Sequence, residues 1–272
     1  MIIDTHCHYN LAPLLTDWTK YWRQAQDHGV AKSIVVGANL ISSQAAVDIA
    51  ATDPNLFAAV GIHPEESQAE DIDDQLTQLQ LLAKTPSTPL IAIGEIGLDY
   101  YRLSDSKDPV ATQQAQQQLF AAQIELANQL QLPMIVHVRD RETPETQTSG
   151  NAYWDALQMI KVQFKQRNSL IMHCASGPLS YIQQAVDLGA YIGMAANVTY
   201  KKADHLQQLA RLIPPDRLLF ETDAPFLPPQ AFRGQTCEPW MITQTADFLT
   251  ANFNFSLTQV YQNSLTCFQL PH

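Results

Sequence analysis

The chain has 272 residues, of which 46% are hydrophobic and 8% are aromatic. This length is sufficient for one large core, and αβ barrels of this size commonly form a single domain. The formal net charge is −11, with 16 Lys and Arg against 27 Asp and Glu. Such a charge argues against broad electrostatic contact with duplex DNA or with an anionic membrane. It does not exclude a nuclease whose positive charge comes from bound cations, because the ion dominates the local field in a metal site.

The four cysteines form no C-x-x-C pair, which argues against a zinc knuckle or a thioredoxin-type site. Reduced thiols in a cytosolic protein are the simplest interpretation. A strand-like segment begins at Ile2, so we expect no secretion signal. No apolar run approaches the length of a membrane span. We therefore expect a cytoplasmic protein that does not bind a membrane.

Eight short apolar segments recur along the chain and are typical of buried strands. They are Ile2–His6, Ser33–Ala38, Phe57–Ile62, Leu90–Gly94, Met134–Val138, Leu170–Cys174, Ala190–Met194 and Leu218–Thr222. Stretches rich in Ala, Gln and Leu lie between them, and these residues favour helices. Examples are Ala111–Gln131, Tyr153–Phe164, Ser180–Leu188 and Ala203–Leu212. The polar segment Arg139–Gly150 is expected to be a long loop.

Alternating strands and helices, with one strand per 34 residues on average, predict a (β/α)8 TIM barrel. We expect it to form a single domain over residues 1–272. A doubly wound open sheet is the alternative architecture. That fold would need a glycine-rich phosphate-binding turn to hold a nucleotide, and the sequence contains none.

The first predicted strand runs into the H-x-H pair formed by His6 and His8. Residues i and i+2 of a strand point to the same face, so both imidazoles project from one side, about 6–7 Å apart along the strand. Two neutral imidazoles that converge on one point bind a borderline divalent cation well. Taken alone, the pair is equally compatible with two surface histidines.

Further metal-ligand residues fall at the ends of later predicted strands. They are His63 after the third strand, Glu95 after the fourth, His137 in the fifth, His173 in the sixth and Asp223 after the eighth. Each has an ordinary alternative explanation: the carboxylates could cap a helix or begin a turn, and the histidines could be hydrogen-bonded barrel residues. The active site of a TIM barrel lies at the C-terminal ends of its strands. The joint occurrence of these residues there predicts a metallohydrolase site.

The motifs around these residues occur in a fixed order over nearly the whole chain. They are IDTHCH, VGIHPE, IGEIGLDYY, IVHVRD, MHCASG, LLFETDAPFLPP and RGQTCEP. Together they resemble the TatD family of metal-dependent deoxyribonucleases, within the amidohydrolase-like barrels. The resemblance implies a TIM barrel, in agreement with the strand count.

The resemblance also implies a site for two divalent ions. His6, His8 and Asp223 would hold one ion, His137 and His173 would hold the other, and Glu95 would bridge them. His63 would lie just outside the metal shell and face the substrate phosphate, or else order the turn before Pro64. Arg139 is a second candidate for a phosphate contact, with a solvated loop arginine as the alternative.

Two segments depart from the family pattern. The stretch between His137 and His173 is longer, with RETPETQTSGNAYW inserted, and could form a rim over the site. The segment AANVTY at 195–200 also differs from the commoner pattern. Neither change touches a proposed ligand, so both bear on substrate preference rather than on the metal centre.

Imidazole and carboxylate ligands suit zinc, manganese or nickel, whereas magnesium prefers mostly oxygen ligands. A pair of ions activates a water and clamps the attacking and leaving oxygens of a phosphodiester. Glu95 would hold the ions together, and Asp223 could accept the proton of the attacking water. We expect a DNase that acts on single strands or ends, contacts its DNA or oligonucleotide locally and needs no obligate protein partner.

Two other functions are compatible with the sequence. One is a hydrolase of the same barrel type that acts on a small ester, lactone, amide or phosphoester. The other is a non-catalytic, metal-dependent binding protein, against which the base-capable Asp223 argues.

Overall fold

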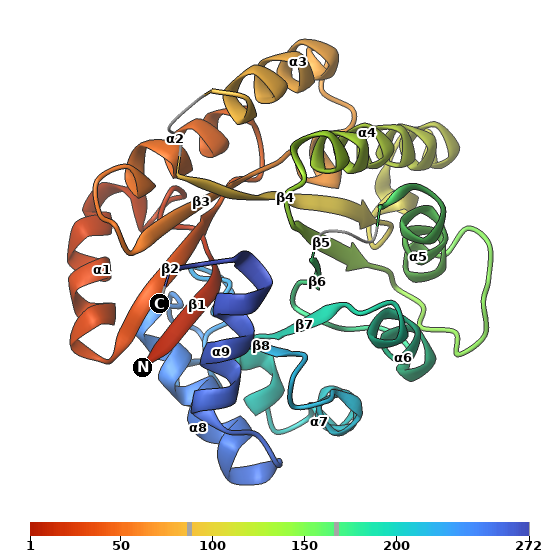
Figure 1. Cartoon of the computed structure of the whole chain (residues 1–272). Helices are drawn as coiled ribbons and strands as arrows, with labels where there is room; N and C mark the ends of the chain where they lie inside the picture. Colours follow the sequence, from red (N-terminus) through yellow and green to blue (C-terminus); the bar gives the residue numbers. More distant parts are fainter. Residues whose placement is uncertain (86–88, 166–168, 272) are drawn as a thin grey trace.

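The computed structural model describes residues 1–85, 89–165 and 169–271. Eight parallel strands form one sheet, and each strand pairs with the next along the chain. A parallel bridge between Cys7 and Ala224 joins the first strand to the segment after the last, so the sheet forms a nearly closed barrel. The helices surround this barrel (Figure 1). The predicted TIM barrel is confirmed.

Each of the eight predicted segments overlaps one strand, although the second strand begins at Val30, three residues before its predicted start. The strands are β1 (Ile2–Cys7), β2 (Val30–Val36), β3 (Leu56–Val60), β4 (Leu90–Asp99), β5 (Met134–Arg139), β6 (Leu170–Met172), β7 (Tyr191–Met194) and β8 (Leu218–Phe220). The predicted end of β4 was wrong, because this strand continues past Gly94 and Glu95 lies within it. The extension pairs with β5 as far as Asp99 and Arg139. β6 and β8 end earlier than predicted, so His173 and Asp223 lie in the loops that follow them.

The helices are α1 (Trp18–Asp27), α2 (Leu40–Ala50), α3 (Ile72–Ala83), α4 (Pro109–Leu130), α5 (Ala152–Gln163), α6 (Leu179–Asp187), α7 (Asp204–Leu212), α8 (Ile242–Asn252) and α9 (Leu257–Phe268). α4 begins two residues before its predicted start. The Asp108 carboxylate accepts a hydrogen bond from the Ala111 N–H, and Pro109 occupies the first helical position. Both features favour a helix start at this point. Among the described helices, none is long and apolar enough to cross a membrane.

Apolar side chains fill the early part of the barrel interior. Ile3, Ile34, Ile135 and other strand residues form this layer together with the end of α9, which contributes Phe268 among others. A larger apolar cluster lies between the strands and the surrounding helices. The polar site residues therefore lie at the opposite, C-terminal ends of the strands, as expected for this fold.

Candidate metal centre

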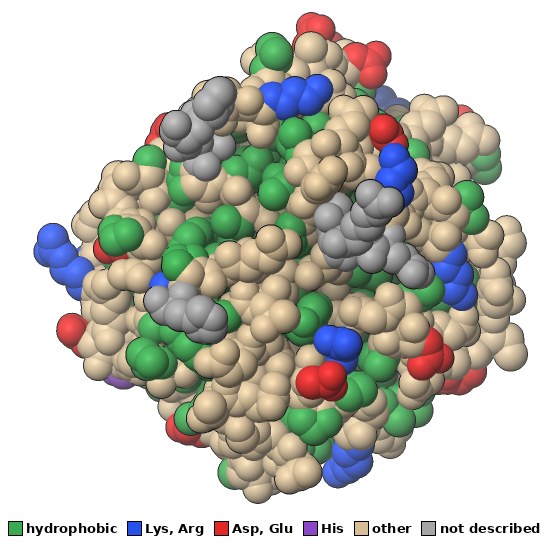
Figure 2. Space-filling model, in the orientation of Figure 1, with side chains coloured by type: hydrophobic (Ala, Val, Ile, Leu, Met, Phe, Trp, Pro, Cys, Tyr) green, Lys and Arg blue, Asp and Glu red, His purple; other side chains and the backbone are tan. Residues whose placement is uncertain are grey.

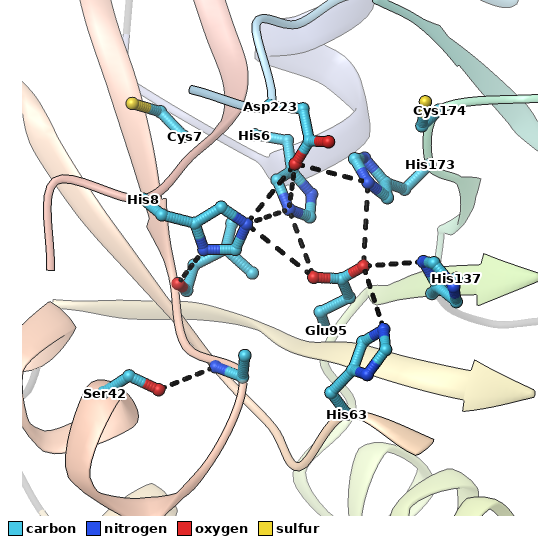
Figure 3. Close-up of polar contacts among 12 residues, drawn as sticks. His6, Cys7, His8, Ser42, His63, Glu95, His137, His173, Cys174 and Asp223 are labelled. Carbon is cyan, nitrogen blue, oxygen red and sulfur yellow. Dashed lines mark hydrogen bonds and ion pairs between the residues drawn. The ribbon is translucent and has the colours of Figure 1, made fainter. Parts of the chain in front are cut away.

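The structure brings the six predicted metal ligands and the predicted phosphate-contact residue His63 together at the C-terminal end of the barrel (Figure 3). They are His6, His8, His63, Glu95, His137, His173 and Asp223. Six of them line a cavity of about 580 Å³, and His6 is fully buried beside it. The predicted phosphate-contact residue Arg139 also lines this cavity. The volume lies within the usual range for small-molecule sites.

Glu95 lies in the middle of the histidines, and its two oxygens face different pairs of them. Oε1 is 2.9 Å from Nδ1 of His137 and 3.6 Å from Nε2 of His173. Oε2 is 3.5 Å from Nε2 of His6 and 3.7 Å from Nε2 of His8. This is the arrangement required of a carboxylate that bridges two cations.

Asp223 approaches three imidazoles through one oxygen. Its Oδ1 lies 3.4 Å from Nε2 of His8, 3.7 Å from Nε2 of His173 and 3.8 Å from Nε2 of His6. The backbone of Asp223 is left-handed, with φ of 57°, and its carbonyl accepts a hydrogen bond from the Phe226 N–H. Asp tolerates this conformation better than most residues. The carboxylate therefore faces His173 as well as His6 and His8.

Three of the histidines have an oxygen within 3.2 Å of the ring nitrogen that points away from the cavity. Nδ1 of His8 donates to a backbone carbonyl at the end of β2, at 2.8 Å. Nε2 of His137 lies 3.2 Å from Asp99, and Nδ1 of His173 lies 3.1 Å from Glu221. Such an acceptor keeps the proton of a neutral imidazole on the outer nitrogen. The inner nitrogen then presents its lone pair to the cavity, as a metal ligand must.

His63 has the opposite arrangement. Its Nδ1 accepts a hydrogen bond from the Glu65 N–H and thereby caps the short helical turn Pro64–Glu66. Burial and the neighbouring His137 lower the pKa of His63 to about 4, so the ring is neutral at pH 7. The proton must then lie on Nε2, which is 3.8 Å from Oε1 of Glu95. His63 therefore both orders its turn and presents an N–H donor to the cavity.

The charges of the site favour ionised carboxylates. Burial alone would raise the pKa of Glu95, but hydrogen bonds from His137 and His6 hold this pKa well below its usual value. Burial opposes protonation of His137, yet hydrogen bonds to Asp99 and Glu95 raise its pKa to about 9. Burial also opposes protonation of His173, but the neighbouring Glu221 carboxylate raises the pKa of this histidine to about 10. The ionised carboxylates thus favour positive charge in the cavity, either as protons on His137 and His173 or as a bound cation.

This donor set fits divalent cations. Four groups of His, Cys, Asp or Glu, drawn mostly from the residues above, place possible ligand atoms within 4.8 Å of one another. Nε2 of His6 and Nε2 of His8 are only 3.1 Å apart, and the latter carries the lone pair in the neutral ring. The buried Nδ1 of His6 has no hydrogen-bond partner among the described residues. A cation between the two Nε2 atoms and the carboxylates would occupy the position on which these nitrogens converge.

Comparison with known proteins identifies the family. The model of TatD-related DNases matches residues 3–269 of the chain. The chain belongs to this family. A protein of Mycoplasma pneumoniae named an uncharacterized metal-dependent hydrolase is 33% identical over 265 residues, which cover 95% of this chain and 94% of that protein. The protein is therefore a metal-dependent hydrolase of the TatD family.

Two further TatD-family proteins resemble the chain closely. The 3'-5' ssDNA/RNA exonuclease TatD of Erwinia tasmaniensis is 30% identical over 219 residues, which cover 80% of this chain and 77% of that protein. The crystal structure of YJJV, a TatD homolog from Escherichia coli K12, superposes with a TM-score of 0.87. It is 28% identical and covers 99% of this chain and 98% of its own.

Two glutamines of α4 hold the strand ends that carry site residues of this TatD-family barrel. The Gln123 side chain accepts from the N–H of Ile62 and donates to its carbonyl, next to His63. Gln116 does the same with the backbone of Asp99. Both glutamines are buried, and each satisfies two backbone groups at the end of a strand.

Two glycines make room for the carboxylate–histidine contacts. Gly97 on β4 has φ of 146°, and a Cβ there would lie 1.9 Å from the His137 carbonyl oxygen. Gly193 on β7 faces Glu221, and a Cβ there would lie 2.3 Å from its carboxylate oxygen. A side chain at either position would displace the residue that it meets.

Asp99 and Glu221 are site residues that the sequence reasoning missed. Both are buried and lie behind the imidazoles of His137 and His173. Weak signals were present, because Asp99 follows Glu95 in the same motif and Glu221 precedes Asp223 by two residues. Such outer carboxylates orient metal-binding imidazoles and raise their basicity.

The inserted segment after β5 was expected to be able to form a rim over the metal centre, but it does not line that cavity. Residues 140–151 adopt no helix or strand, whereas Arg139, which was predicted to begin the loop, is the last residue of β5. Several residues of the loop line a separate hollow of about 380 Å³. Glu145 from this loop accepts hydrogen bonds from the N–H groups of Leu179 and Ser180 at the start of α6. This attachment holds the loop beside the main cavity, whose described lining includes Arg139 but no residue of 140–151.

Proposed function

We propose that this TatD-family protein is a deoxyribonuclease that cleaves phosphodiester bonds at or near the ends of single-stranded DNA with two divalent ions. The position of Glu95 carries the proposal. Its two oxygens face two separate pairs of histidines within a cavity open to substrate. Two-metal sites of this kind are common in nucleases and phosphatases.

The proposed ligands follow from the inner donor atoms. We assign His6, His8 and Asp223 to one ion, His137 and His173 to the other, and Glu95 to both. The outer acceptors on three of the rings support this assignment, because they leave the inner nitrogens free to coordinate. The mixture of imidazole and carboxylate suits zinc, manganese or nickel better than magnesium.

The side chains of the cavity have separate roles in the proposed reaction. When bound, two divalent ions would lower the pKa of a coordinated water and neutralise charge on the phosphate. Asp223, whose side chain is 14% exposed, is placed to accept the proton of the attacking water. His63 would donate its Nε2–H to a phosphate oxygen. Arg139 would contact the phosphate from the mouth, where its guanidinium lies 4.0 Å above the Tyr101 ring.

The charge distribution favours a local contact with a single strand. The net charge of −11 argues against an extended basic surface. On the face shown in Figure 2, which lies at the N-terminal ends of the strands and opposite the cavity, the Lys and Arg side chains are scattered singly. A duplex-binding surface would need basic residues gathered along one stripe. The exonuclease activity in the name of the Erwinia tasmaniensis relative also supports a single-stranded substrate.

A small phosphoester or ester is the second candidate substrate. The Mycoplasma pneumoniae relative is named only as a metal-dependent hydrolase, and the cavity has the volume of a small-molecule site. A non-catalytic binding role is disfavoured by Asp223 and by the family. We further propose a cytoplasmic location, since all four cysteines are free thiols.

Metal analysis of the purified protein and cleavage assays test the proposal together. The substrates are single-stranded oligonucleotides labelled at the 3′ or 5′ end, their duplexes, and a panel of small esters and phosphoesters. We expect about two ions per chain, turnover of single strands above duplexes, and complete loss of turnover with EDTA. Turnover of the small esters alone would favour the second candidate, and turnover that resists EDTA would contradict both.

A further inference from the structure

One exposed aromatic side chain lines the metal-centre cavity, and a second packs against a charged residue of its lining. The chain contains 10 Phe, 9 Tyr and 4 Trp. Among the described residues, only Phe226 and Tyr101 are exposed, at 51% and 37%. Phe226 lines the cavity, and Tyr101 lies under Arg139, which lines it as well. Single exposed apolar residues are common on protein surfaces, but an exposed aromatic ring in the lining of a cavity that also carries charged side chains points to a ligand.

Phe226 is held rigidly next to the metal centre. Its N–H donates to the carbonyl of Asp223 at 2.8 Å, and the neighbouring Pro225 carbonyl accepts from the Cys237 N–H at 3.1 Å. Its ring stands edge to face with His8, with the two ring centroids 5.9 Å apart and the planes at 72°. The ring is thus fixed beside a proposed metal ligand while half of the residue remains accessible. A ring fixed in this way loses little conformational freedom when a ligand stacks on it.

The cavity has a polar part and an apolar part. Glu95, His63 and Arg139 supply charge and hydrogen bonds, whereas Phe226 and the neighbouring Leu227 supply apolar surface. A nucleotide has the same division, with a charged phosphate at one end and a flat aromatic base at the other. A small aliphatic ester would make no comparable use of an exposed ring.

We infer that Phe226 is a stacking platform for the base of the nucleotide whose phosphate lies at the metal centre. The inference rests on the proposed function and names the feature of the substrate that this site recognises. Every base has a π face, so such a platform binds all four bases and requires them unpaired and accessible. It would therefore select single strands and ends without selecting sequence.

Binding of product-like ligands tests the platform without any cleavage step. The probes are dTMP and 2-deoxyribose 5-phosphate, titrated by calorimetry into the metal-loaded protein. Loss of a base–aromatic stack corresponds to a factor of roughly 5–150 in affinity, about 1–3 kcal/mol. We expect the wild type to bind dTMP tighter than the sugar phosphate by this factor, and Phe226→Ala to remove the difference while binding the sugar phosphate normally.

Two further variants separate stacking from general packing. Phe226→Trp should keep the preference for dTMP, whereas Phe226→Leu should lose most of it although it preserves apolar bulk. Leu81→Ala on α3, a residue 65% exposed and outside the cavity lining, is the matched control and should behave as the wild type. Equal weakening of both ligands in Phe226→Ala, or equal binding of both by the wild type, would overturn the platform.

Cleavage assays distinguish failure of the platform from failure of the proposed function. Oligonucleotides with a normal or an abasic terminal residue are the substrates. Phe226→Ala should lower kcat/KM roughly 5–150-fold on the normal oligonucleotide and leave the abasic one unchanged. If the wild type cleaves neither but still prefers dTMP, the nuclease fails and the nucleotide platform stands. If it cleaves both equally well and shows no preference for dTMP, the nuclease stands and the platform fails.

Discussion

Replacing Glu95 with alanine should remove both metal ions and all turnover while leaving the barrel folded. The Glu95 side chain is 7% exposed, and its carboxylate lies within 3.8 Å of five imidazoles. Four of these belong to proposed ligands of the two ions. Loss of one carboxylate therefore affects both ions at once, unlike loss of any single histidine.

The expected magnitude follows from charge and distance. Two unit charges about 4 Å apart interact by about 4 kcal/mol at an effective dielectric constant of 20. A factor of ten in affinity corresponds to about 1.4 kcal/mol, so each ion, which carries twice the unit charge, should bind at least about a thousandfold more weakly. The fold should persist, because the barrel is stabilised by the apolar layer at the early part of the strands and by the cluster under the helices.

The assay combines elemental analysis at a buffered free-metal concentration, thermal melting and oligonucleotide cleavage. Glu65→Ala is the matched control, because Glu65 is an exposed carboxylate that lines the same cavity. It removes an equal charge without removing the carboxylate between the histidines, and its backbone N–H can still cap the turn at His63. Full metal content and full turnover in Glu95→Ala would refute the two-metal reasoning.

Three further predictions concern the other site residues. His63→Ala should keep both ions and lower kcat/KM roughly 10–150-fold, about 1.5–3 kcal/mol for a hydrogen bond to a charged group; loss of metal would instead make His63 a ligand. Asp99→Ala should weaken one ion roughly 10–100-fold and spare the other, as measured by competition with a chelator; equal weakening of both would disprove its role behind His137. Metal affinity and turnover should fall as pH falls toward 5, because protons compete for His137 and His173, whose pKa values are about 9 and about 10. Metal binding at pH 7 should then release protons, and a rate that stays flat from pH 8 to 5 would contradict this.

The strands and the candidate ligands could be predicted because both depend on local patterns. A short apolar segment followed by a histidine or carboxylate marks a strand and its C-terminal end within a few residues. The end of β4 was predicted wrongly because its last residues pair with β5, up to Asp99 and Arg139. That pairing lies 40 residues away in the sequence and cannot be read from the local pattern of Ile96, Gly97 and Leu98.

The outer carboxylates could not be predicted for a related reason. Asp99 meets His137 38 residues away, and Glu221 lies 3.1 Å from His173, which it follows by nearly fifty residues. Neighbouring strands bring the first pair together, whereas the second pair meets across β7, where Gly193 leaves space for the carboxylate. Sequence spacing within a motif carries no information about such contacts.

His63 differs from three of the other histidines in the group that lies behind its outer ring nitrogen, which the sequence does not reveal. At His8, His137 and His173 an acceptor lies behind the ring and leaves the inner nitrogen as a base. At His63 a backbone N–H lies behind the ring and leaves the inner nitrogen as a donor. A ring nitrogen that carries a proton cannot bind a cation, but it can donate to a phosphate oxygen. The group behind the outer ring nitrogen therefore divides these four histidines into three suited to hold metal and one suited to face the substrate.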